Sequence, residues 1–300
     1  MVDHSVLPSK PAPFPCRVLI VSLLILAHLI LPLTCRASAA AAQEEHYTMG
    51  VFPFLPMPTL EGIFAPIAAE LSRALGRPVR LQSASSFDKF TANLERQQYD
   101  IAHIHPFEYV LTGAKAGYVP VVTRTEKLKT VFAVTNESPL RAPRDLKGKV
   151  IGLPPENASV SYLAKVALIR SGLKPGRDFA VKHFSTHQSC LQQLLIGNIV
   201  SCATSPPALR LFEPQPQKPF RTILSSPEIP QTLFVVHRRI PAAQREAIKK
   251  ALVQSRLPGI DPALRKLFIH KETGTEGYFR SVSDKDYDNV RSYLKLIGKQ

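Results

Sequence analysis

The feature that most constrains the fold of this chain is an alternation of short apolar, β-rich runs with segments of helical periodicity. In the first third, β-type runs and helical segments alternate at residues 47–51, 59–75, 78–82, 86–97 and 100–104, and a further helix begins at Phe107. Gly76 follows the first helical segment, as is typical of a helix end. Strands that alternate with helices predict a parallel sheet with helices on both sides.

A second series of the same kind begins at residue 150. Strands are expected at 150–153, 179–183 and 199–204, and helices at 159–171, 188–196 and 207–212. Apolar strands at 119–123, 130–135 and 232–236 separate the two series and predict connections between them. We therefore expect an α/β protein with two lobes, each a mostly parallel sheet flanked by helices, joined by two crossing strands. Lobe 1 would comprise 45–130 with 232–300 returning to it, and lobe 2 would comprise 131–231.

The first 39 residues are expected to be a signal peptide. Arg17 precedes an apolar run at 18–31, and Pro32 and a tract of small residues at 37–42 follow it. An uncleaved anchor is one alternative, because about 18 apolar residues can span a bilayer, and lipidation of Cys35 is another. No second run is long enough to span a membrane, so the remainder is predicted to be a soluble, exported periplasmic protein.

Charge and cysteine content limit the partners of the exported part. Without residues 1–39 the chain loses three of its 38 basic and one of its 23 acidic residues, so its formal net charge falls from +15 to +13. A basic surface concentrates anions. The basic residues form no dense run, so no nucleic-acid partner is expected. Cys190 and Cys202 remain, and they form either one disulfide in an oxidising compartment or two separate buried thiols.

Four segments in a fixed order carry a resemblance to a known family. They are 47–50, with the long helix that follows, then 99–107, 155–163 and 226–230, and residues 277–280 and 283–284 match the family's closing segment. In these segments the chain resembles the phosphate/phosphite/phosphonate-binding subunits of ABC importers, a branch of the type II periplasmic binding proteins. The resemblance implies a monomeric binding protein that delivers a small oxyanion to an ABC permease in the inner membrane by hinge closure.

The third segment opens a predicted helix with Ser159, Val160 and Ser161. A helix start leaves backbone N–H groups without partners and carries the positive end of the helix dipole, so hydroxyls there complete a cradle for an oxyanion. The alternative is that one of these serines is only an N-cap. Family members commonly have three successive hydroxyl residues here, whereas Val160 interrupts the run in this chain.

Three histidines are further candidates for ligand contacts. His103 and His105 flank Ile104, the position of an aromatic ligand contact in some relatives, and His187 matches a histidine near the ligand. Aminoalkylphosphonate binders follow that histidine with Glu, but Gln188 follows it here, which indicates a ligand without an ammonium group. Binding through these histidines would strengthen below the usual pKa of about 6.5. A metal site is the alternative, although no Cys or carboxylate completes it.

Thr204 and Ser205 end a predicted strand, where they would contact the ligand or simply form a turn. Phe52 and Phe54 either wall the pocket or pack within their loop. No nucleophile elbow, Cys-His signature or phosphate-binding glycine loop is present, so the chain is predicted not to be an enzyme and to need no cofactor. The alternatives to transport are a periplasmic ligand sensor for a signalling system, a His-mediated metal-binding protein on the same fold, and a hydrolase on this scaffold.

Overall fold

The computed structural model describes residues 45–212, 220–268 and 277–299. The chain divides into residues 1–45 and 46–300, and the second unit is described here by itself. The predicted signal peptide, with its anchor and lipidation alternatives, lies outside the described residues. Within the described ranges, no helix combines the length and the apolar character that a membrane crossing requires.

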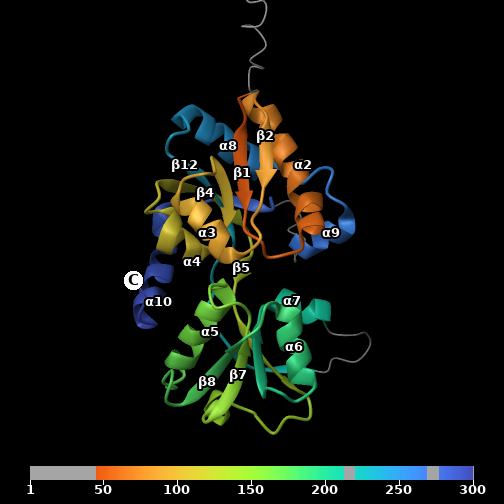
Figure 1. The fold of residues 1–300 in the computed structure, drawn as a ribbon, viewed down its shortest axis with the longest axis vertical. Helices are drawn as coiled ribbons and strands as arrows, with labels where there is room; N and C mark the ends of the chain where they lie inside the picture. The colour runs from red at the N-terminus through yellow and green to blue at the C-terminus, as the bar shows by residue number, and fades with distance from the viewer. Residues whose placement is uncertain (1–44, 213–219, 269–276, 300) are drawn as a thin grey trace, which may run out of the picture. The chain divides into compact units, whose positions relative to one another are not determined.

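The unit has two halves, each built around one sheet. The first half contains a six-stranded mixed sheet, with strands from both the beginning and the end of the chain (Figure 1). Its strands lie in the order β13 (Phe279–Ser281), β4 (Tyr118–Arg124), β12 (Leu233–His237), β3 (Ile101–Ile104), β1 (Tyr47–Val51) and β2 (Val79–Gln82). β1 pairs in parallel with both β2 and β3, whereas β12 runs antiparallel to β3 and β4. The carboxyl ends of β1, β2 and β3 therefore lie at one edge of the sheet.

A five-stranded sheet forms the second half. Its strands lie in the order β10 (Phe220–Ser225), β6 (Val131–Thr135), β9 (Ser201–Thr204), β7 (Lys149–Leu153) and β8 (Phe179–His183). β7 is parallel to β8 and β9, and β6 is antiparallel to β9 and β10. The carboxyl ends of β7, β8 and β9 again share one edge.

Two chain segments connect the sheets. The outgoing segment contains β4, β5 (Lys127–Leu128) and β6, and the returning segment contains β10, β11 (Ile229–Pro230) and β12. β5 and β11 pair antiparallel, with Leu128 opposite Ile229. Both sheets are consequently mixed rather than mostly parallel, because each connecting segment adds antiparallel strands. The expected α/β class and the two crossing segments are present.

Helices flank the strands. In the first half they are α2 (Met57–Leu75), α3 (Phe87–Glu95), α4 (Pro106–Glu108), α8 (Ala242–Gln254), α9 (Pro262–Phe268) and α10 (Asp288–Leu296), together with a π-helical turn (Tyr109–Gly113) and a 3-10 turn (Asp284–Tyr287). In the second half they are α5 (Ser159–Arg170), α6 (His187–Leu195), α7 (Pro206–Phe212) and a 3-10 turn (Pro143–Leu146).

Helix α2 shows how the sequence specifies one of these elements. Leu60, Ile63, Phe64, Ile67 and Leu71 recur at helical spacing, and all are buried in the core of the first half. The helix ends at Gly76, whose φ of 60° is a left-handed conformation that glycine adopts without steric cost. The predicted strands and helices lie within a few residues of those observed, but β5, β10, β11, β13 and α9 were not expected.

The second half contains a disulfide between Cys190 on α6 and Cys202 on β9. Their Cα atoms are 6.0 Å apart, and both residues are fully buried. Gly152 on β7 lies directly against this bond, and a Cβ at this position would collide with the side chain of Ile199 and approach Cys190 Sγ to 2.9 Å. The disulfide therefore occupies space that only a glycine on the neighbouring strand leaves open.

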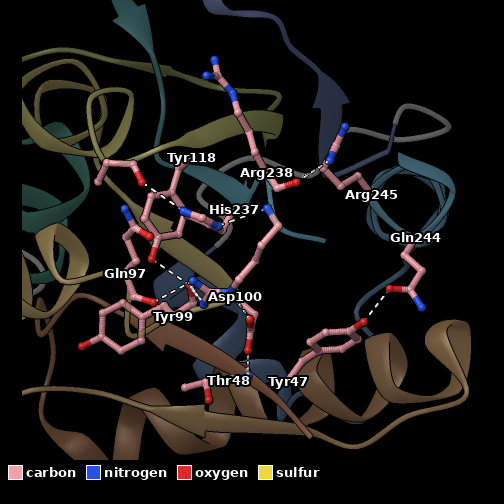
Figure 2. A network of polar contacts seen from close by, with 12 residues as sticks. Tyr47, Thr48, Gln97, Tyr99, Asp100, Tyr118, His237, Arg238, Gln244 and Arg245 are labelled. Carbon is pink, nitrogen blue, oxygen red and sulfur yellow. Dashed lines mark hydrogen bonds and ion pairs between the residues drawn. The ribbon is translucent and has the colours of Figure 1, made fainter. Parts of the chain in front are cut away.

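The amino-terminal edge of the first sheet is held by a polar network, which Figure 2 shows. The Asp100 carboxylate accepts hydrogen bonds from the Thr48 backbone N–H and the Arg239 guanidinium, both at 2.8 Å. Arg239 also donates to the carbonyls of Gln97 and Tyr99, at 2.8 and 2.6 Å. These bonds connect the starts of β1 and β3 to the residues that follow β12.

Candidate functional site

A cavity of about 540 Å³ lies where the carboxyl edges of the two sheets meet the connecting segments. Its lining includes residues that follow β1, β2 and β3 in the first half and β7, β8 and β9 in the second, with further residues from 124–129 and 231–232. Ligands of open α/β sheets bind beyond the carboxyl ends of the strands. The volume lies within the usual range for small-molecule sites, about 300–1,000 Å³.

The start of α5 faces this cavity through Ala158, Ser159 and Val160. Ala158 is the N-cap and its side chain cannot accept a hydrogen bond, so α5 has no side-chain cap. Among the described residues, no acceptor is bonded to the backbone N–H of Ser159 or Val160. Thr130 anchors this turn, because its hydroxyl donates to the Val160 carbonyl at 2.9 Å. The cavity thus contains two fixed donors at the positive end of a helix dipole.

His105 provides the hydrogen-bond acceptor for the Ser159 hydroxyl. His105 is the N-cap of α4, and its Nδ1 accepts a hydrogen bond from the Glu108 backbone N–H at 3.1 Å. Nδ1 is therefore the unprotonated nitrogen of the neutral ring, and Nε2 carries the proton. Ser159 Oγ lies 3.0 Å from the same Nδ1, so the hydroxyl donates to it. An oxyanion placed here would be within reach of the backbone donors, and the Ser159 hydroxyl would have to rotate to join them.

His187 lines the cavity at the start of α6, where Thr186 is the N-cap. Its Nδ1 lies 2.8 Å from Thr204 Oγ1 on β9. Thr204 is fully buried behind the cavity wall and orients His187, while Ser205 lines the cavity itself.

Burial makes both lining histidines neutral near pH 7. It lowers the pKa of His105 to about 3 and the pKa of His187 to about 4, because the charged rings would be desolvated. The same effect raises the pKa of Glu108, whose Oε2 lies 3.9 Å from His105 Nε2, to about 7. The expectation of stronger binding just below pH 6.5 assumed exposed rings, whereas His105 is buried and His187 is half-buried.

Two predicted contact residues do not line the cavity. His103 is fully buried, with its ring 4.8 Å from Phe64 and 4.9 Å from Phe234. Strand β3 ends at Ile104, so the strand alternation that would place His103 and His105 on one face stops before His105. Ser161 is also fully buried, and its hydroxyl donates to the Pro154 carbonyl at 3.1 Å. It follows Ser159 by two helical residues, about 200° around the helix, and so points away.

Charged residues of the connecting segments were missed by the sequence reasoning. Arg124, Glu126, Lys127 and Lys129 all line the cavity, and Arg210 of α7 adds a fifth charge. The buried Arg124 guanidinium forms an ion pair with Glu126 at 2.6 Å. Burial lowers the pKa of Arg124, whereas the Glu126 carboxylate raises it. The described lining therefore has four basic residues and one acidic residue, an excess of positive charge.

Thr232 was also missed. It lies between β11 and β12 and lines the cavity, and its buried hydroxyl oxygen has no hydrogen-bond partner among the described residues. A buried polar group without a partner is costly, so this hydroxyl is suited to contact a bound molecule. Nothing in the local sequence distinguishes Thr232 from an ordinary strand residue, since its role depends on the cavity.

In the described part of the chain, no group of three or more His, Cys, Asp or Glu side chains is placed to hold a metal ion.

Comparison with known protein families gives a match over most of the chain. The family model described as "ABC transporter, phosphonate, periplasmic substrate-binding protein" matches residues 49–287. The chain belongs to this family. Members of this family are substrate-binding proteins of transporters rather than enzymes, and the family is periplasmic.

Solved structures show the same fold at low sequence identity. PhnD1 from Prochlorococcus marinus, solved with methylphosphonate, has a TM-score of 0.69 at 15% identity and covers 86% of this chain and 100% of its own. A binding protein component of an ABC phosphonate transporter from Pseudomonas aeruginosa has a TM-score of 0.68 at 14% identity, with coverages of 85% and 87%. A Xanthomonas citri protein solved with a chloride ion has a TM-score of 0.69 at 17% identity, with coverages of 84% and 98%.

Proposed function

We propose that this phosphonate-family binding protein holds the oxyanion of its ligand at the start of α5, in the cavity between the two sheets. The uncapped N–H groups of Ser159 and Val160 carry this proposal, because an oxyanion supplies the acceptors that Ala158 lacks. His187 and Ser205 are the adjacent donors on the second half, and Thr204 positions His187. His105 completes the site from the first half and shares a hydrogen bond with Ser159.

The charge of the lining supports an anionic ligand. Lys127 and Lys129 belong to the segment that joins the sheets, and Arg210 lies on α7 across the cavity. Clefts lined by one sign of charge concentrate ions of the opposite sign and accelerate their capture. The net positive charge of the whole chain acts in the same direction.

Closure would take place about the connecting segments. The β5–β11 ribbon has few pairs, Leu128 with Ile229 and Lys127 with Pro230, so changes in backbone angles there would rotate one sheet against the other. Residues 45–130 with 232–300 would move as one lobe against 131–231. The closed form would then be recognised by an ABC permease, with the protein acting as a periplasmic monomer after removal of residues 1–39.

Isothermal titration calorimetry of the purified protein with methylphosphonate, phosphite and phosphate tests this proposal. We expect at least one of them to bind with a micromolar or lower Kd, and the affinity to fall as salt is raised because the lining is cationic. Sulfate-free buffer is needed, since sulfate would compete. Absence of binding by all three at millimolar concentration would contradict the proposed ligand class.

A further inference from the structure

The two walls of the cavity differ in chemistry. The wall from the loops after β7, β8 and β9 combines apolar residues such as Pro155 and Pro206 with hydroxyls, His187 and helix-start amides. The opposite wall, from the loops after β1 and β2, consists of apolar residues only among those described: Phe52, Pro53, Phe54, Leu55, Pro56 and Phe87. A phosphonate group needs donors around its oxygens, so the apolar wall faces some other part of the ligand.

The aromatic residues of this wall form a single packed group. Phe52 stacks on Phe54 with ring centroids 4.6 Å apart, and Phe87 meets Phe52 edge-on at 5.8 Å. Phe52 is buried and is backed by the rings of His103 and His105, at 5.5 and 5.6 Å. Phe54 and Phe87 are only half-buried, so they present ring surface to the cavity. Preformed apolar surface of this kind favours an apolar or aromatic group.

The described lining of the cavity has no acidic group available for a ligand ammonium group. Glu126 is the only carboxylate in the described lining, and it forms a 2.6 Å ion pair with Arg124. A ligand ammonium would have to compete with this guanidinium for the carboxylate. The cavity is also larger than a tetrahedral headgroup, since about 540 Å³ corresponds to roughly 18 water molecules at about 30 Å³ each.

From these observations, and resting on the proposed oxyanion site, we propose that the ligand is an organophosphonate with an apolar carbon substituent. Its phosphonate oxygens contact the amides of Ser159 and Val160, and its substituent packs against Phe54 and Phe87. The substituent is a ring or a branched chain without a cationic group. The apolar wall then determines which phosphonates bind, while the start of α5 recognises the part that they share.

Calorimetric titration with phenylphosphonate, methylphosphonate and 2-aminoethylphosphonate tests this inference. We expect phenylphosphonate to bind at least about tenfold more tightly than methylphosphonate, because the ring adds several buried carbons. 2-Aminoethylphosphonate should bind no better than methylphosphonate. In Phe87→Ala and, separately, Phe54→Ala, the preference for phenylphosphonate should fall about fivefold or more while methylphosphonate affinity stays within about twofold.

Tyr293→Ala is the matched control, since Tyr293 is a half-buried aromatic residue of α10 outside the cavity lining. It should leave the preference unchanged. Equal or tighter binding of methylphosphonate, or tightest binding of 2-aminoethylphosphonate, would overturn the inference and leave the proposed oxyanion site intact. Binding of none of the three would overturn the proposed function as well. If one Phe variant fails to fold, thermal unfolding will reveal it and the other variant decides the outcome.

Discussion

The two ends of the first sheet differ in how their polar groups are satisfied. At the amino-terminal end, the Asp100 carboxylate accepts a hydrogen bond from the Thr48 backbone N–H (Figure 2). It also accepts one from Arg239, which makes further bonds to backbone carbonyls. At the carboxyl-terminal end, which borders the cavity, Thr232 Oγ1 has no bonded partner among the described residues. The amides at the start of α5, which line the same cavity from the second half, also have none there. Satisfied polar groups indicate a structural role, and unsatisfied groups beside a cavity indicate a ligand.

The largest effect is expected when the central acceptor of the amino-terminal network is removed. Asp100→Ala leaves the Thr48 N–H and the Arg239 guanidinium without their acceptor, which should lower the free energy of unfolding by about 2 kcal/mol. Methylphosphonate affinity should not change, since the network lies at the edge away from the cavity. Urea unfolding and calorimetry measure the two quantities, and a changed affinity with unchanged stability would reverse the assignment.

A second test asks whether burial of a histidine beside the cavity lowers the free energy of unfolding at acidic pH. His187 has a folded pKa of about 4, lowered by burial, against about 6.5 when unfolded. As the pH falls, the unfolded chain therefore binds a proton first, and stability is lost between about pH 6.5 and pH 4. We expect His187 to account for a loss of about 1 to 2 kcal/mol between pH 7 and pH 5.

His187→Gln isolates this contribution. The variant keeps a polar side chain but has no group that titrates at this position, so its stability should fall less than that of the parent over the same pH range. His105 and Glu108 are present in both proteins, and their effects cancel in the difference. Identical pH dependence of the two unfolding free energies would show that His187 is not buried as a neutral ring.

The sequence predicted the order of elements because each long apolar run has a clear period. The strands that were not predicted are short or lack such a pattern. β13 has three residues, and β10 alternates only weakly between buried and exposed positions. Ser159 lines the cavity, and it was a candidate because a hydroxyl there opens a helix. Ser161 was predicted to belong to the same cradle but does not line the cavity, because the helical repeat places it on another face.

The charged residues of the cavity could not be predicted from local sequence patterns. In the sequence, Arg124 looks like an ordinary exposed residue at the end of an apolar strand. The fold instead buries it beside Glu126, where the connecting segment leaves the first sheet. Thr232 became a candidate only because its hydroxyl lies within a cavity formed by distant segments. Such roles depend on tertiary packing, which brings residues more than a hundred positions apart into one lining.

In the proposed site, backbone amides at the start of α5 bind the oxyanion, and two substitutions at one position test this role of the amides. Ser159→Ala removes the hydroxyl, and Ser159→Pro removes the hydroxyl and the N–H together. Proline suits this first helical position, and Ala158 before it already has extended angles, φ −72° and ψ 141°. Any loss of the His105 contact is common to both variants.

Calorimetry with methylphosphonate should show Ser159→Ala within about threefold of the parent protein, because the hydroxyl is occupied by His105. Ser159→Pro should bind about tenfold more weakly than Ser159→Ala, a difference of about 1.4 kcal/mol, with a similar melting temperature. Equal affinities of the two folded variants would contradict the claim, since the amide would then contribute nothing to binding.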